Sequence, residues 1–206
     1  MNPDIVFTSG MSNSKGDDPF KPIRDAGICV FCIPSSSSVA AIYEDISVIA
    51  TILGEKKRGA EMVATMKKDL AKLEAIGKSI PKDKRKTVYF EIGAAPYIYT
   101  TGGNTFINES ISLIGAENVF GSEENPWLSI SEEQVIAKNP DIIITQVHYI
   151  PNAVNEIKSR SAWKSINAIK NGAVYQVDED LLAQPCQHVV KGIEELAKFV
   201  YPEYFK

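Results

Sequence analysis

Two nearly identical heptapeptides decide the fold, namely Asn2-Pro3-Asp4-Ile5-Val6-Phe7-Thr8 and Asn139-Pro140-Asp141-Ile142-Ile143-Ile144-Thr145. In each, the proline cannot continue a preceding helix, and the residue before it is kept out of the α-helical region. The apolar run that follows is typical of a strand covered on both faces. Each heptapeptide therefore predicts the end of a helix and the start of a parallel strand.

The stretches that follow the two heptapeptides are also alike. Each continues with a helix-forming stretch, a glycine (Gly27 or Gly172), a strand, a proline-containing loop and an amphipathic helix. A repeat of this kind indicates two lobes built on one plan. Strands and helices at residues 88–138 precede the second copy, whereas only Met1 precedes the first. We therefore expect that on the order of 50 residues of the first lobe are missing.

Apolar runs and helical patterns alternate along the whole chain. We predict strands at residues 5–7, 28–33, 88–92, 142–144 and 174–177, and helices at residues 39–53, 55–80, 106–114, 131–138 and 189–200. This alternation predicts an α/β protein with two lobes of parallel sheet flanked by helices. The long helix would span more than ~30 Å and join the lobes. We thus expect an incomplete N-terminal lobe (1–54), a linking helix (55–80) and a C-terminal lobe (81–206).

Composition and charge exclude several classes of protein. A net charge of −4 without a basic cluster argues against a nucleic-acid partner. No run approaches the eighteen or so apolar residues of a membrane span, so we expect no direct span. Cys29 and Cys32 have CxxC spacing, but they lie in an expected strand on opposite faces. We interpret them as buried core thiols rather than as a redox or zinc pair.

The sequence also lacks the usual signatures of catalysis. A nucleotide-binding lysine loop, GxGxxG, GxSxG and HExxH are all absent from the 206 residues. Two histidines without a neighbouring cysteine or carboxylate cluster do not make a closed zinc site. We therefore predict no catalytic residue, no cofactor and no resident metal.

Candidate ligand-binding residues follow from the rule that ligands of open α/β lobes lie beyond the carboxyl ends of the strands. The rule selects loops at residues 9–12, 34–38, 93–99, 146–149 and 184–188. From these loops and the segment around residue 127 we predict that the ligand-binding residues are Tyr97, Tyr99, Trp127, His148, Tyr149, His188, Ser9 and Ser35.

The aromatic residues in this set offer flat, amphipathic surface for a large planar or chelate ligand, although we expect about half of them to lie in the core. The two histidines could coordinate a metal centre of the ligand. We favour the alternative that each is a loop histidine held by hydrogen bonds.

Several motifs in combination resemble one known family. They are the Asn-Pro-Asp strand starts, residues 97–120, residues 127–135, a run from Arg160 through Trp163 to Asp178, and the closing stretch at 192–205. Together they resemble class III periplasmic binding proteins, the substrate-binding components of ABC importers. The resemblance covers essentially the whole chain, and no single motif would suffice.

This resemblance implies a non-catalytic carrier rather than an enzyme. Such a protein binds an iron-siderophore, haem, cobalamin or similar metal complex in a cleft between two lobes. It works outside the cytoplasm, in the periplasm or on the cell surface, and in its full-length form is lipid-anchored. Its partner is an ABC permease, which an acidic residue on each lobe contacts. Glu133 is the matching position here, with Glu132 beside it, although both glutamates could simply favour the positive end of a helix.

Two alternatives remain open beside the carrier. A metal chelatase-like enzyme of related two-lobe architecture would use His148 and His188 to handle metal. An interaction module is the other alternative, because an incomplete lobe would expose a strand edge and apolar surface, both of which favour self-association.

Overall fold

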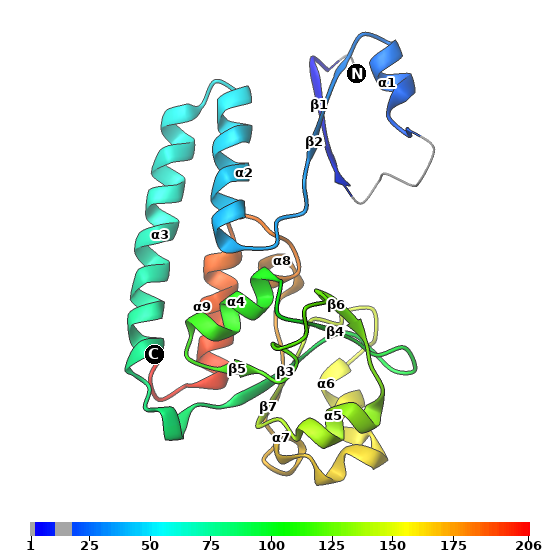
Figure 1. Ribbon diagram of the computed structural model, residues 1–206, viewed down its shortest axis with the longest axis vertical. Coiled ribbons are helices and arrows are strands. Elements are labelled where there is room, and N and C mark those ends of the chain that lie inside the picture. The colour runs from blue at the N-terminus through cyan, green and yellow to red at the C-terminus, as the bar shows by residue number, and fades with distance from the viewer. Residues whose placement is uncertain (1–2, 11–17) are drawn as a thin grey trace. The chain divides into compact units, whose positions relative to one another are not determined.

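The computed structural model describes residues 3–10 and 18–206, and the chain divides into two compact units, Met1–Ser36 and Ser37–Lys206 (Figure 1). Asn2 of the first heptapeptide lies outside the described residues, as do Met11 and Ser12 of the loop expected at 9–12. The division at residues 54 and 80 remains a prediction.

Within its described residues, unit 1 contains a two-stranded parallel sheet and one short helix. Strand β1 (Ile5–Ser9) pairs with β2 (Cys29–Ile33), with helix α1 (Lys21–Asp25) between them in sequence. Both strands and their parallel pairing confirm the prediction. Cys29 and Cys32 are exposed, so their interpretation as core thiols is wrong. The reason is that two strands and one five-residue helix cannot cover both faces of the sheet.

Unit 2 is built around a six-stranded sheet in the order β6-β4-β3-β7-β8, with β5 also paired to β3. The strands are β3 (Thr87–Gly93), β4 (Tyr99–Thr101), β5 (Glu117–Asn118), β6 (Trp127–Ser129), β7 (Ile142–Thr145) and β8 (Val174–Gln176). Strands β5, β3, β7 and β8 pair in parallel, whereas β4 and β6 pair antiparallel. The parallel strands of this sheet were predicted, apart from the two-residue β5, and the antiparallel ones were not.

The predicted helices of unit 2 are present. Its helices are α2 (Val39–Ile52), α3 (Lys56–Ser79), α4 (Phe106–Leu113), α5 (Glu132–Lys138), α6 (Ala153–Ser159), α7 (Asn167–Lys170), α8 (Glu179–Leu182), α9 (Val189–Val200), and the 3-10 turns η2 (Lys82–Lys84) and η3 (Ser161–Ser165). Helices α2 and α3 pack side by side (Figure 1). None of the helices in the described ranges is both long and apolar enough to cross a membrane.

The core of unit 2 lies on both faces of its sheet. Val88 and Phe90 of β3 enter one apolar cluster with residues of α3, α4 and α9. Tyr89, between them, enters a second cluster with residues of α5, α6 and η3, including Trp163. Successive residues of β3 therefore point to opposite faces and are all buried, which explains why the sequence of this strand shows no polar alternation. This two-sided packing fixes where β3 and β7 end and where their loops begin.

Candidate functional site

The loop that leaves β3 carries two of the predicted aromatic residues. Tyr97 lies in the loop, and Tyr99 begins β4 opposite Gly93 in the antiparallel pairing with β3. A Cβ atom at residue 93 would lie 3.2 Å from the Cβ of Tyr99, a crowded approach. Glycine at this position therefore makes room for the Tyr99 side chain beside the end of β3.

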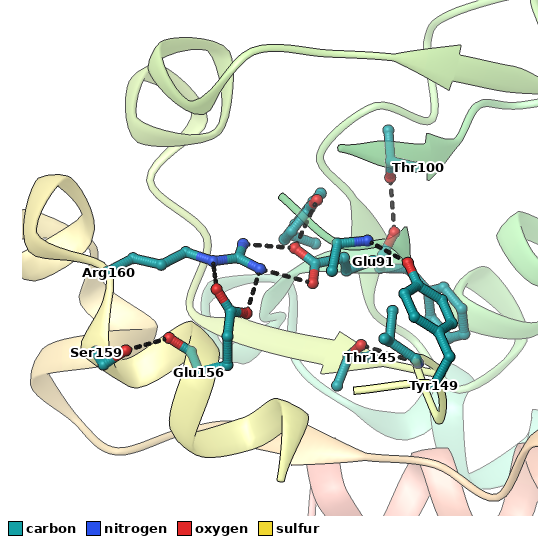
Figure 2. A network of polar contacts seen from close by, with 11 residues as sticks. Glu91, Thr100, Thr145, Tyr149, Glu156, Ser159 and Arg160 are labelled. Atoms are coloured by element: carbon teal, nitrogen blue, oxygen red, sulfur yellow. Dashed lines mark hydrogen bonds and ion pairs between the residues drawn. The ribbon is translucent and has the colours of Figure 1, made fainter. Parts of the chain in front are cut away.

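Tyr149, on the loop that leaves β7, reaches back to the end of β3. Its hydroxyl oxygen accepts a hydrogen bond of 2.9 Å from the backbone N–H of Ala94 (Figure 2). Because Ala94 directly follows β3, the loops after β3 and β7 meet at this contact. Within the described part of the chain the Tyr149 hydroxyl has no other partner, so its own hydrogen is free to be donated.

Trp127 joins the same group of strands through β6. In the pairing of β6 with β4, Tyr99 lies opposite Ser129 and Thr101 lies opposite Trp127. Tyr99 and Trp127 are thus diagonal neighbours on one face of the paired strands, a separation that large aromatic side chains can bridge. Strands β4 and β6, which the sequence did not reveal, are what bring these two residues together.

All four aromatic side chains are exposed, with exposed fractions of 78% for Tyr97, 70% for Tyr149, 51% for Trp127 and 44% for Tyr99. The expectation that about half of them lie in the core is wrong. They lie on the loops after β3 and β7 or on the short strands β4 and β6, outside the buried parts of β3 and β7. We call these four residues the aromatic site. Exposed apolar surface that gathers in one place is typical of a binding surface.

His148 is exposed, but both of its ring nitrogens have partners in its own unit. Nε2 lies 3.0 Å from the carbonyl oxygen of Val177, and Nδ1 lies 3.3 Å from the side-chain nitrogen of Gln176. These contacts suit a neutral imidazole that donates from Nε2 and accepts at Nδ1. The favoured interpretation, a loop histidine held by hydrogen bonds, agrees with this geometry.

His188 lies elsewhere, at the start of α9. Its Nε2 is 3.1 Å from the side-chain nitrogen of the neighbouring Gln187. It lines a pocket of about 480 Å³ between α3 and α9, together with Met62 and Met66. None of the four residues of the aromatic site lines this pocket, so the structure does not bring His188 to them.

Ser9 and Ser35 belong to unit 1. Ser9 is the last residue of β1 and pairs with Ile33, the last residue of β2, two positions before Ser35. Because β1 and β2 are parallel, both serines lie at the carboxyl edge of their sheet, and both are exposed. Their assignment to a ligand site stays a prediction.

The two glutamates expected to contact a permease begin helix α5. Ser131 caps this helix in a reciprocal arrangement with Gln134, and Glu132 and Glu133 occupy the first turn. Hydrogen bonds from Ser131 and from the backbone N–H of Glu133 itself lower the pKa of the fully exposed Glu133 carboxyl. Glu133 therefore lies where a negative charge interacts favourably with the positive end of the helix, and it also presents a carboxylate to solvent.

A buried ion cluster near the aromatic site was missed by the sequence reasoning. The Arg160 guanidinium donates from Nη1 and Nη2 to the two oxygens of Glu91 at 2.7 and 3.0 Å, and from Nε and Nη2 to Glu156 at 3.0 and 2.6 Å (Figure 2). Glu91 has no exposed surface, and Arg160 is 8% exposed. One signal was available in the sequence, because a carboxylate inside the apolar run 88–92 requires a buried partner.

Burial and the neighbouring charges shift the pKa values of this cluster in opposite directions. Burial raises the pKa of Glu91, while the hydrogen bonds and the charge of Arg160 act in the opposite direction. Burial lowers the pKa of Arg160, but the hydrogen bonds and charges of Glu156 and Glu91 raise it by more than burial lowers it. The net shift of this pKa is therefore upward. The guanidinium therefore stays charged between two carboxylates.

No metal centre is apparent in the residues that the structure describes. Nowhere among them do three or more His, Cys, Asp or Glu side chains gather as a metal site requires. The aromatic site offers apolar contact from its four exposed rings and a hydrogen bond that the Tyr149 hydroxyl can donate.

Comparisons with known proteins agree with one another. A family model described as "Periplasmic binding protein" matches residues 1–181. An uncharacterised ABC transporter substrate-binding lipoprotein, YvrC of Bacillus subtilis (strain 168), is 35% identical over 206 residues, which are 100% of this chain and 64% of that protein. A cobalamin-binding protein of Halobacterium salinarum is 26% identical over 96% of this chain and 53% of its own length.

A solved structure shows the same arrangement of elements. It is a possible iron-binding (periplasmic solute-binding) protein from Staphylococcus epidermidis, with a TM-score of 0.82, 28% identity, and coverage of 97% of this chain and 77% of that one. The chain thus spans between about half and two thirds of the length of the two curated relatives. The family match extends over most of the chain and through both units, and the resemblance found in the sequence is confirmed: the chain belongs to the periplasmic binding protein family.

Proposed function

We propose that the chain is the ligand-binding part of an extracytoplasmic substrate-binding protein, which carries a metal complex to an ABC permease. The single observation that carries the proposal is the aromatic site, whose four exposed rings lie on the loops after β3 and β7 and on the paired strands β4 and β6. Relatives named for cobalamin binding and for possible iron binding support a metal complex such as cobalamin, haem or an iron-siderophore. A planar or chelate ligand suits such a surface because its faces are apolar and its edges are polar.

The mode of binding follows from this assignment. The rings would contact the face of the complex, and the Tyr149 hydroxyl would donate a hydrogen bond to a polar group at its edge. The ligand would lie in a cleft between the two predicted lobes and be enclosed by motion about the helix at 55–80. Ser9 and Ser35 would contribute from the first lobe.

A fluorescence titration tests the proposal. The chain has two tryptophans, of which Trp163 is buried and Trp127 exposed, so cyanocobalamin, haemin or ferric citrate bound at the aromatic site should quench Trp127. We expect stoichiometric quenching, a smaller quenching amplitude in Trp127→Phe, and at least tenfold weaker binding in Tyr149→Ala. The control is Leu53→Ala, which truncates an exposed apolar side chain at the C-cap of α2. Equal weakening in this control would contradict the assignment.

Contact with the permease is the second part of the proposal. Glu133, exposed and held in the first turn of α5, is the residue that we assign to it, with Glu132 in support. In a reconstituted importer, Glu133→Lys should abolish ligand uptake and leave ligand binding unchanged. The matched control is Glu123→Lys, which changes an exposed loop residue. Normal uptake by the Glu133 variant would refute the contact.

Lipid anchoring of the full-length protein rests on the relative named as a lipoprotein. Metabolic labelling of the full-length protein with a radioactive fatty acid should give a labelled band. A secreted, unlabelled product would refute anchoring.

Self-association of this chain is a further part of the proposal. Strands β1 and β2 form a parallel pair with no further strand beside them in the described residues, and such a pair is marginal by itself. We expect a concentration-dependent dimer in sedimentation velocity experiments. A strictly monomeric species at high concentration would refute this part and leave the ligand proposal unaffected.

A further inference from the structure

The segment of residues 146–160, which carries Tyr149, is tied at three points to β3 or to Ala94, the residue after it. Figure 2 shows two of these contacts, those made by Tyr149 and Arg160. At the start of the segment, the N–H of Gln146 donates to the carbonyl oxygen of Glu91 at 3.1 Å. At its middle, Tyr149 accepts from Ala94, three residues beyond Glu91. At its end, Arg160 holds the Glu91 carboxylate. A single residue of β3, Glu91, thus binds both ends of the segment, one through its backbone and one through its side chain.

The contact at the end of the segment is rigid. Two parallel hydrogen bonds between a guanidinium and a carboxylate fix both the distance and the plane of the pair, which a single bond does not. Glu156, in the first turn of α6, holds the same guanidinium from a second side. The Arg160 guanidinium also lies 4.3 Å from the centre of the buried Trp163 ring. Helix α6 therefore cannot shift along β3 without breaking several buried contacts at once.

We propose that Arg160 is a positioning residue of the aromatic site, which holds α6 against β3 and thereby sets where Tyr149 lies. The inference rests on the proposed function in one respect, namely that the aromatic site is where ligand binds. Arg160 itself would not touch the ligand, because its side chain is 6% exposed. Its effect reaches the ligand through the loop between β7 and α6 and through the Tyr149–Ala94 hydrogen bond.

Amide hydrogen exchange at Ala94 tests this without any ligand, since the Ala94 N–H is the donor to Tyr149. In Arg160→Lys, which keeps the charge but loses the two-pronged contact, we expect Ala94 to exchange at least tenfold faster. Ile143 lies on β7, the strand next to β3, and its N–H donates to the carbonyl oxygen of Ala173. Its exchange should stay the same. Unchanged exchange at Ala94, or faster exchange at every amide alike, would overturn the proposal.

Glu156→Gln provides a gentler variant that keeps the buried pair of Glu91 and Arg160. It should speed exchange at Ala94 about threefold or more and leave the fold intact, because Glu156 is partly exposed. The matched control is Glu194→Gln, which breaks an exposed pair with Lys198 at the same i,i+4 spacing. This control should leave Ala94 unchanged, and an equal effect from it would contradict the proposal.

A double-mutant cycle, with cyanocobalamin and haemin as ligands, then tests whether the contacts of Arg160 affect ligand binding. Arg160→Lys should weaken binding about fivefold in the native background and by less than twofold in Tyr149→Phe, because Arg160 acts through the Tyr149 hydroxyl. Full additivity of the two losses would overturn the proposal. If neither probe binds the native chain, the proposed function fails for these ligands, and exchange at Ala94 still decides whether Arg160 positions Tyr149.

Discussion

The two copies of the heptapeptide form the same element in two different environments. Ile5, Val6 and Phe7 lie in β1 and are partly exposed, whereas Ile142, Ile143 and Ile144 lie in β7 and are buried. Both strands pair in parallel with a neighbour, so the local sequence is sufficient for strand formation and direction. Burial is different, because it depends on helices and strands contributed by distant parts of the chain.

The polar residue that ends each heptapeptide shows the same contrast. The Thr145 hydroxyl accepts a hydrogen bond of 3.1 Å from the N–H of Val147 and so starts the loop that carries Tyr149. Thr8 occupies the equivalent position, but its buried hydroxyl oxygen has no partner among the described residues. One side-chain type therefore organises a loop in unit 2 and is left unpaired in unit 1.

The largest expected difference between the two units concerns their ion pairs. Arg160→Met would leave the buried Glu91 carboxylate without its cation, with only the Tyr89 hydroxyl bonded to it, and we expect it to lower the free energy of unfolding of unit 2 by about 3–5 kcal/mol. In unit 1, Lys21 pairs with Asp25 at 2.5 Å, but both side chains are more than half exposed. Lys21→Met should therefore cost no more than about 1 kcal/mol. Urea unfolding monitored by circular dichroism measures both, and similar losses would contradict the contrast.

A matched pair of core substitutions should give the next largest difference. Ile142 and Ile5 occupy the same position in the two heptapeptides, and Ile142 is 4% exposed. Ile142→Ala should lower the free energy of unfolding by about 2–5 kcal/mol, because it removes packing from a filled core. Ile5→Ala should change it by less than about 1 kcal/mol, because its site is partly open to solvent. Equal effects would show that β1 is buried in solution, by self-association or otherwise.

The strands and helix ends that depend on local sequence pattern were predicted well. The predominantly apolar runs identified β3, β7 and β8, and glycines marked the ends of helices, as at Gly115 with its positive φ of 83°. It did not predict β4, β5 and β6, because strands of two or three residues are too short to show a period. Since β4 and β6 bring Tyr99 beside Trp127, the aromatic site could be named residue by residue but not assembled.

Long-range pairing was also beyond the sequence. Glu91 and Arg160 are separated by 69 positions, and nothing near either residue names its partner. The position of Glu91 inside an apolar strand signals that some cation must reach it, and only the packing of α6 against the sheet selects Arg160. The two histidines show a similar limit, since both follow strands in sequence, yet only His148 lies at the end of β7 and β8, bonded to Val177 and Gln176.

The smallest effect that we predict is a shift in melting temperature on substitution of Glu133. It distinguishes the stabilising role of this residue at the start of α5 from its proposed contact with the permease. Because the folded state lowers the pKa of this carboxyl, its charge stabilises the fold above the ordinary pKa of a glutamate, about 4, and this contribution is lost as the pH falls through the lowered value. Glu133→Gln should thus unfold at a slightly lower temperature than the native chain at pH 7, and the two melting temperatures should converge once the pH falls below the lowered pKa of this carboxyl.

The control for this measurement is Glu123→Gln, in an exposed loop, which should match the native chain at both pH values. Helix α1 of unit 1 differs from α5, because it has neither a side-chain cap nor an acidic residue in its first turn. A Glu133→Gln variant as stable as the native chain at every pH, but defective in uptake, would leave permease contact as the sole role of this carboxylate.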